Sequence, residues 1–231
     1  EQQKKAIGKM NDLNRKNIIK YFGENTKDKH DKFDVVSAQM MIHYLLRGEV
    51  TFNNFCQNIN QYLEVNGYFI VTTLDATKII EFLAGKESKK VYYETKDGEK
   101  NTLFEIVRQF DPKRTDFQST GIPIDVYMAW VSADESNYNT EYLVDYNFFV
   151  NEMEKRCGLK LIDSELFENI YHLNRGYFEE VVDYHEDAAT RNFLQDVKKY
   201  YVNDSKMVKA CFEYTKLHRY YIFQKVGKKE Q

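Results

Sequence analysis

Two side chains that suit ligand binding follow directly after an apolar segment. In residues 33–46, FDVVSAQMMIHYLL, the polar residues Gln39, His43 and Tyr44 lie just past a predicted strand at 33–38. Ligands of open α/β sheets bind beyond the carboxyl ends of the strands, which is where a polar, stacking His–Tyr pair would lie. The competing interpretation is a buried, hydrogen-bonded histidine followed by a core aromatic residue.

Sequence motifs for other chemistries are missing. No two of the ten glycines form a GxG, and the sequence holds no P-loop, HExxH or GxSxG motif. The cysteines, Cys56, Cys157 and Cys211, are odd in number and form no CxxC, which disfavours a disulfide framework or a zinc site and favours an intracellular, reducing setting. The acidic run 183–187 could bind a metal ion, but a solvated helix start is the favoured interpretation.

Composition sets broad limits. Hydrophobic residues make up 42% and charged residues 30% of the 231 residues, which permits a packed core. The net charge of −3 gives no overall reason to expect strong phosphate binding. No apolar run approaches the length of a membrane span, and the charged N-terminus does not resemble a signal peptide. Because no Met begins it, we expect the sequence to lie inside a longer polypeptide.

The spacing of apolar residues predicts alternating strands and helices in the first half. We expect helix 1–22, strand 33–38, helix 51–65, strand 68–73 and helix 75–85. Strand–helix–strand units of this length form parallel sheets with helical cover. The strand 33–38 lacks polar alternation, so we expect both its faces to be covered. Asn66–Gly67 is expected to close the helix before it.

The second half begins with an antiparallel insertion at about 88–135. A hairpin with its turn at 96–99 is followed by a strand at 124–130. After this insertion the pattern predicts the helix 142–157, the strand 159–164, helices over 164–180 and 187–201, and a final strand at 218–226.

Several short motifs occur along the chain in a fixed order. They are FDVVSAQ with the following HY, then NGYFIVTTLDATKI, TEYL at 140–143, NEM at 151–153 and a tyrosine in the last strand, HRYYIFQK. Together they resemble one enzyme family, the eukaryotic and viral mRNA cap guanine-N7 methyltransferases. TTLD, TEYL and ATRNF look most like the capping enzymes of large DNA viruses. The resemblance covers about residues 30–226.

This resemblance implies an α/β fold, the class I (Rossmann-like) S-adenosylmethionine-dependent methyltransferase sheet with an inserted antiparallel region. Residues 1–231 would form a single methyltransferase domain, incomplete at its N-terminus, because the family's glycine-rich cofactor loop lies upstream of FDVVSAQ. The implied reaction transfers a methyl group from S-adenosyl-L-methionine to N7 of the GpppN cap. Since N7 is already nucleophilic, no catalytic base or metal is required, and orientation supplies the rate.

The resemblance also implies roles for individual residues. Glu141 would accept hydrogen bonds from guanine, although a charge at a helix N-terminus is the alternative for this residue. His43 and Tyr220 would complete the cap site. Gln39, Tyr44 and Ser37 would bind the cofactor.

Expected partners are capped RNA and possible further capping-enzyme domains or a stimulatory subunit, with no membrane. The expected location is intracellular: a viral particle or the host cytoplasm for a viral protein, otherwise the nucleus. Two alternatives remain open from the sequence. One is a catalytically inactive, methyltransferase-like stimulatory subunit, which the missing glycine loop favours. The other is a methyltransferase with a different substrate.

Overall fold

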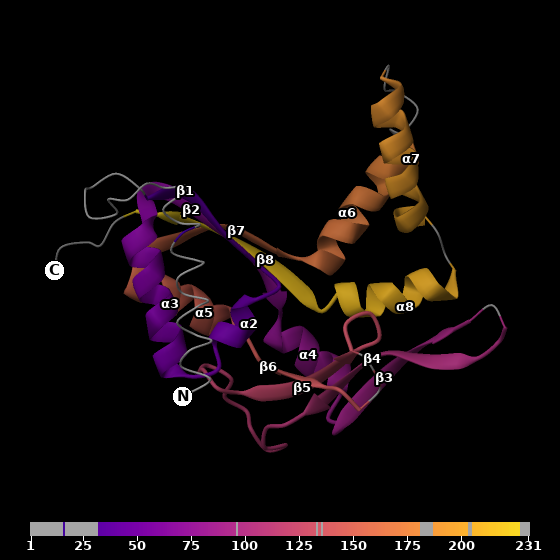
Figure 1. Ribbon diagram of the computed structural model, residues 1–231, viewed down its shortest axis with the longest axis horizontal. Coiled ribbons are helices and arrows are strands. Elements are labelled where there is room, and N and C mark those ends of the chain that lie inside the picture. The colour runs from indigo at the N-terminus through magenta and orange to yellow at the C-terminus, as the bar shows by residue number, and fades with distance from the viewer. Residues whose placement is uncertain are drawn as a thin grey trace.

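The computed structural model describes residue 16 and residues 32–95, 97–132, 134, 136–180, 187–202 and 205–226. The predicted helix 1–22 therefore lies outside the described residues, apart from Lys16. The described strands form two four-stranded sheets, one in the order β1-β2-β8-β7 and the other in the order β3-β4-β5-β6 (Figure 1).

The first sheet begins with the predicted strand–helix–strand unit. β1 (Phe33–Gln39) pairs in parallel with β2 (Leu63–Leu74), and α2 (Ile42–Leu45) and α3 (Glu49–Tyr62) connect them. β8 (His218–Lys225) runs antiparallel to β2, and β7 (Leu159–Leu166) runs antiparallel to β8. The expectation of a mostly parallel sheet thus holds for one of the three pairings among the described strands. The reason is that β8 enters the sheet at the carboxyl end of β2.

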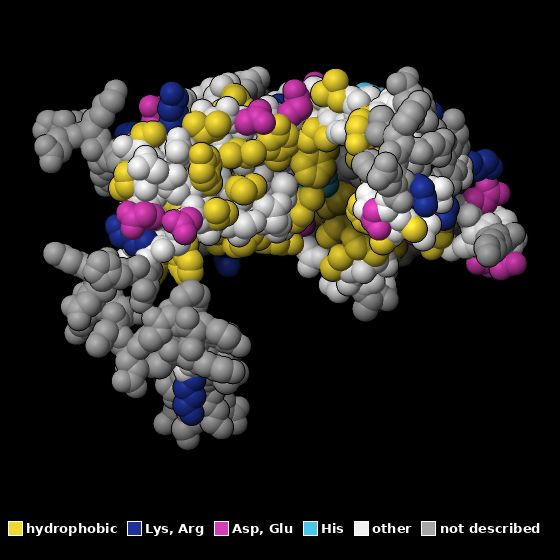
Figure 2. All heavy atoms as spheres, turned by 90° about the horizontal axis from the view of Figure 1, so that it is seen from above, with side chains coloured by type: hydrophobic (Ala, Val, Ile, Leu, Met, Phe, Trp, Pro, Cys, Tyr) yellow, Lys and Arg dark blue, Asp and Glu magenta, His cyan; other side chains and the backbone are white. Residues whose placement is uncertain are grey.

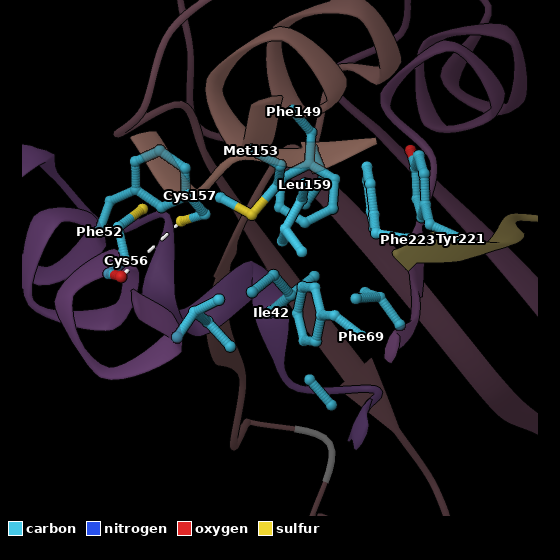
Figure 3. Packing of buried hydrophobic residues seen from close by; sticks show 14 of the residues in the cluster. Ile42, Phe52, Cys56, Phe69, Phe149, Met153, Cys157, Leu159, Tyr221 and Phe223 are labelled. Carbon is cyan, nitrogen blue, oxygen red and sulfur yellow. Dashed lines mark hydrogen bonds between the residues drawn. The ribbon is translucent and has the colours of Figure 1, made fainter. Parts of the chain in front are cut away.

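Helices cover one face of this sheet. α3 and α5 (Tyr146–Cys157) pack on it around a fully buried aromatic core (Figure 3). That core contains Phe52, Phe69, Phe149, Tyr221 and Phe223. The other face is open in the described part of the chain, where Val35 is 51% exposed and Tyr68 also reaches the surface. Figure 2, which looks down on this side, shows hydrophobic side chains gathered there. The expectation that strand 33–38 is covered on both faces is therefore wrong for the described residues.

The strand β2 begins directly after α3 and contains a bulge near its start. α3 stops at Tyr62, and β2 already includes Asn66 and Gly67, so these residues do not close the helix as predicted. The pairing with β1 is irregular there, and Asn66 has a positive φ of 69°. A Cβ on Gly67 would lie 2.8 Å from the carbonyl oxygen of Asp34, a distance that real Cβ contacts do not reach. The glycine thus allows the two strands to approach each other.

The second sheet is the predicted antiparallel insertion. It consists of β3 (Ser88–Glu94), β4 (Lys100–Arg108), β5 (Pro123–Met128) and β6 (Asn139–Tyr142), all paired antiparallel. The insertion therefore extends beyond residue 135. α5 begins later than predicted, at Tyr146, because the Asp145 carboxylate caps it by accepting a hydrogen bond from the Phe148 amide. Glu141 consequently lies on a strand and not at a helix N-terminus.

Helices on the second sheet form another core. α4 (Ala76–Leu83) and α8 (Lys206–Thr215), which was not predicted, bury apolar residues against β4 and β5. The predicted helices 164–180 and 187–201 correspond to α6 (Phe167–Glu180) and α7 (Ala188–Val202), which pack together and project away from the sheets (Figure 1).

Backbone hydrogen bonds join the two sheets along a seam. The Ala76 amide, at the start of α4, donates to the carbonyl of Val144, which follows β6, and the Gly121 amide, before β5, donates to the carbonyl of Leu46, which follows α2. The Asp75 amide donates to Leu217, which leads into β8. These bonds bring the carboxyl ends of β1 and β2 next to β6.

Candidate functional site

A tight turn at the end of β1 positions the predicted His–Tyr pair. Met40 has a left-handed φ of 51°, which is uncommon for a residue with a side chain. Its amide donates to the carbonyl oxygen of Thr72 at 2.9 Å and lies 3.1 Å from the Thr72 hydroxyl. The chain therefore reverses immediately after the strand, and α2 carries His43 and Tyr44 to the seam.

His43 is held between the two sheets. This residue is 4% exposed, with its Nδ1 3.3 Å from the Thr73 hydroxyl and its Nε2 3.5 Å from Glu141 Oε2. The Tyr44 ring lies edge-on to it, with 4.2 Å between centroids. Burial, followed by the nearby His218, lowers the pKa of His43 to about 4, so His43 is neutral at pH 7.

Glu141 is a buried acid with one unsatisfied oxygen. It is 2% exposed and pairs with Ile124 of β5. The Tyr44 hydroxyl donates to Oε1 at 3.2 Å, whereas the buried Oε2 has no hydrogen-bond partner. Burial raises the pKa of Glu141 to about 7, against the opposing effect of the Tyr44 hydrogen bond. Three of the predicted site residues, His43, Tyr44 and Glu141, are thus brought into contact.

These three side chains line a cavity of about 490 Å³, a volume typical of small-molecule sites. The complete lining is Met40, His43, Tyr44, Met128, Trp130, Val131, Glu141, Tyr214 and His218. None of these described lining residues is Lys or Arg. The wall is therefore mainly aromatic and apolar, with a single acid.

Sequence reasoning missed three ring-bearing residues of this wall. Trp130 follows β5, Tyr214 lies on α8, and His218 begins β8. His218 Nδ1 lies 3.0 Å from the carbonyl oxygen of Tyr214, so this nitrogen carries the proton. Burial lowers the pKa of His218 to about 4, which leaves it neutral as well. The missed α8 and the late start of α5 hid this part of the wall.

The other predicted site residues lie apart from Glu141. Tyr220 does not line the cavity, and its hydroxyl donates to Asp163 at 2.7 Å on the open face of the first sheet. Tyr220 pairs in register with Thr72, whose hydroxyl donates to Gln39. Gln39 in turn donates to the Ser37 hydroxyl at 2.8 Å. These polar groups form an exposed row across the sheet that ends beside Met40.

The described residues hold no cluster of three or more His, Cys, Asp or Glu able to bind a metal ion. No helix among them combines the length and apolar character that a membrane span requires. Of the acidic run 183–187, only Asp187 is described, and its carboxylate accepts a hydrogen bond from the Thr190 amide in the first turn of α7.

A sequence-family model and a curated relative both match this chain. The sequence model of the mRNA (guanine-N(7))-methyltransferase domain family matches residues 15–226. A probable mRNA-capping enzyme of Acanthamoeba polyphaga mimivirus is 33% identical over 237 residues, covering 98% of this chain and 20% of that enzyme. The chain therefore spans about a fifth of the length of this curated relative.

Solved structures of similar shape were also found. An S-adenosylmethionine-dependent methyltransferase from Clostridium acetobutylicum is 11% identical with a TM-score of 0.40, over 88% of this chain and 62% of that one. The CcbJ methyltransferase from Streptomyces caelestis is 13% identical with a TM-score of 0.40, over 86% and 63% of the respective chains.

Proposed function

The chain belongs to the mRNA (guanine-N7)-methyltransferase domain family, and from this premise we propose that it methylates N7 of the guanine in GpppN-capped RNA, with S-adenosyl-L-methionine as methyl donor. The observation that carries the proposal is the buried, unpartnered Oε2 of Glu141 at the wall of a ligand-sized cavity.

Guanine complements this acid. Its N1–H and exocyclic amine lie side by side on one edge and both donate, so a carboxylate accepts both at once. A buried acceptor without a partner costs about 1–3 kcal/mol, and a bound guanine removes that cost. The two donors also stabilise the ionised form, which offsets the burial that raises the pKa of Glu141 in the free protein. Adenine has no matching pair of donors, so the acid also confers selectivity.

The protein's part in the reaction is then one of orientation. N7 carries a lone pair and needs no base, so a guanine held at its opposite edge presents N7 away from Glu141. His43 and His218 are neutral at pH 7 and put no positive charge beside the reacting atoms. Holding two reactants in line can supply about 7–11 kcal/mol of rate acceleration.

We assign the cofactor side to the end of β1. S-adenosyl-L-methionine supplies a methyl group on a positively charged sulfonium when bound. The exposed hydroxyl and amide groups of Ser37 and Gln39 can hydrogen-bond its polar parts, and the ring of Tyr44 suits a cation. We group Tyr220 with this row, because its strand register aligns it with Thr72 and Gln39, and we assign its expected cap-side position to His218.

We also propose that this domain works beside other capping activities. Its mimivirus relative is a probable capping enzyme about five times longer than the matched region. Other domains of the same polypeptide, or a stimulatory subunit, are the partners this implies. The inactive-subunit alternative predicts cap binding without methyl transfer by the full-length protein.

The test compares Glu141→Gln with wild type in the full-length protein. Glutamine keeps one acceptor oxygen but loses the other, together with the charge. Loss of one hydrogen bond to a charged acceptor, worth about 1.5–3 kcal/mol, predicts a fall in kcat/KM for capped RNA of about 10–10²-fold. The Kd for S-adenosyl-L-methionine should change less than about threefold. Glu105→Gln is the matched control, because Glu105 is a buried acid on the same sheet but does not line the cavity. Equal loss of cap methylation and cofactor binding would contradict the assignment.

A further inference from the structure

We infer that Trp130 is a stacking platform for the first transcribed nucleobase, the N of GpppN. This inference rests on the proposed function, since it requires the guanine to be held at Glu141. It extends the site from one base to two and gives a role to a side chain that guanine recognition does not use.

The strand register separates the backbone positions of Glu141 and Trp130 along β5. Glu141 pairs with Ile124 near the start of β5, whereas Trp130 follows the end of that strand at Met128. At about 3.3 Å per residue, the four steps from Ile124 to Met128 cover about 13 Å. Both ends line the same cavity. The two fused rings of a purine fill about half of such a span, so a guanine at Glu141 leaves the tryptophan end open.

The structure fixes the position of Trp130 from both sides. The Ala129 amide donates to Leu103, and the amides of Val131 and Ser132 both donate to the carbonyl oxygen of Met128. The Tyr214 ring meets the indole at 74° with 5.1 Å between centroids, and the Tyr214 hydroxyl contacts Met128 Sδ. A ring whose backbone and one neighbouring ring are fixed in this way is positioned before any ligand arrives.

The indole nevertheless remains 54% exposed. Its contact with Tyr214 is edge to face, and a ring so exposed at the mouth of a cavity offers a large flat surface for stacking. The described lining residues provide no Lys or Arg for the cap phosphates, so contact with a second base is the interaction this end can offer.

Stacking also suits the chemistry of this ligand. The first transcribed nucleotide varies between messages, and an enzyme that caps all of them must tolerate every base. Stacking on an aromatic side chain does so, because each base has a π-face, and it typically contributes about 1–3 kcal/mol per base. A flexible triphosphate bridge separates the two nucleosides and lets the second base reach the rim.

The experiment uses the full-length protein and three ligands: GpppA, GpppC and an abasic counterpart of GpppA that lacks only the adenine. Trp130 is the single tryptophan of this 231-residue chain. Its fluorescence is isolated as the difference between wild type and Trp130→Phe. Tyr92→Ala serves as the matched control, because Tyr92 is a similarly exposed aromatic residue on the β3–β4 hairpin and does not line this cavity.

We expect GpppA and GpppC to quench Trp130 and to bind about tenfold more tightly than the abasic ligand. In Trp130→Ala that advantage disappears while the affinity for the abasic ligand stays within about twofold. Tyr92→Ala keeps the advantage. Equal quenching by the abasic ligand, or an advantage that survives Trp130→Ala, overturns the inference but leaves guanine recognition intact. If none of the three ligands binds, the proposed function fails and this inference fails with it.

Discussion

Replacing Glu141 by glutamine should stabilise the fold at alkaline pH. Burial raises the pKa of Glu141 from its ordinary value of 4.5 to about 7. Between these values the folded protein keeps a proton that the unfolded chain has released. The free energy of unfolding of wild type therefore falls as pH rises through this window. A difference of about 2.5 pH units corresponds to about 3 kcal/mol at pH 8.

Glutamine resembles the protonated acid in shape and charge. Its carbonyl oxygen can accept from the Tyr44 hydroxyl, as Oε1 does, and its amide can donate toward His43 Nε2, which faces the acid at 3.5 Å. The variant can therefore keep the contacts of the protonated acid, but it has no carboxyl group that ionises as the pH rises.

The assay is urea denaturation of wild type and Glu141→Gln at pH 5 and pH 8, with the free energy of unfolding extrapolated linearly. We expect similar stabilities at pH 5 and a gain of up to about 3 kcal/mol for the variant at pH 8. The low pKa values of His43 and His218 weaken both proteins alike at acidic pH, so only the difference between the proteins counts.

Glu105→Gln is a control whose stability at pH 8 should change in the opposite direction. Burial alone would raise the pKa of Glu105, but hydrogen bonds from Tyr138, Ser88 and Lys90 outweigh burial and lower it. This variant should lose stability at pH 8. If Glu141→Gln were destabilised at pH 8 as Glu105→Gln is, Glu141 would be a structural acid, and the argument that the protein tolerates an unfavourable charge for the sake of binding would be refuted.

Two further predictions concern the same seam. The affinity for a cap analogue should rise with pH up to about 7 and then level off, because Glu141 ionises over this range. Tyr44→Phe removes the hydrogen bond that lowers the pKa of Glu141, so the midpoint of this affinity change, measured by calorimetry at a series of pH values, should move upward. An unchanged midpoint would count against ionised Glu141 as the acceptor. Asp75→Ala should lower the free energy of unfolding, measured by urea denaturation, by about 3–5 kcal/mol, because the 1% exposed carboxylate both caps α4 and accepts a hydrogen bond from Arg219 at 2.7 Å. Asp75→Asn keeps a helix cap and should lose less stability. Equal losses in the two variants would assign the whole effect to the ion pair.

The local pattern of the sequence was enough to predict most elements. Apolar spacing identified the strand–helix–strand unit, and the turn at 96–99 identified the antiparallel hairpin, because both signals depend on near neighbours. The same approach failed at residues 139–145. There an apolar run passes from a short strand into a helix, and the Asp145 cap marks the boundary less strongly than the helical pattern that follows.

Motif resemblance identified residue types better than their positions. Glu141, His43 and Tyr44 come together in the structure, although only His43 and Tyr44 follow a strand that was predicted; Glu141 lies on β6, which was not. Tyr220 and His218 lie two residues apart on β8. Which of them reaches the cavity depends on where β8 begins relative to β2, and a motif does not contain this information. Trp130 carried no signal at all, because its role depends on the length of a cavity formed by two sheets.

The proposed binding residues come from two separate parts of the chain, which meet at the seam. Glu141 and Trp130 belong to one hairpin, β5–β6 with its connecting loop, whereas Ser37, Gln39 and Tyr44 belong to the end of β1 and to α2. In the function we propose, choice of nucleobase belongs to the hairpin and contact with the methyl donor belongs to the end of β1 and α2. The two parts meet through backbone hydrogen bonds and through the Tyr44 hydroxyl, which donates to Glu141. A substitution in the hairpin that leaves Glu141 in place would therefore change which RNA 5′ ends bind while keeping the link to the half that presents the methyl group.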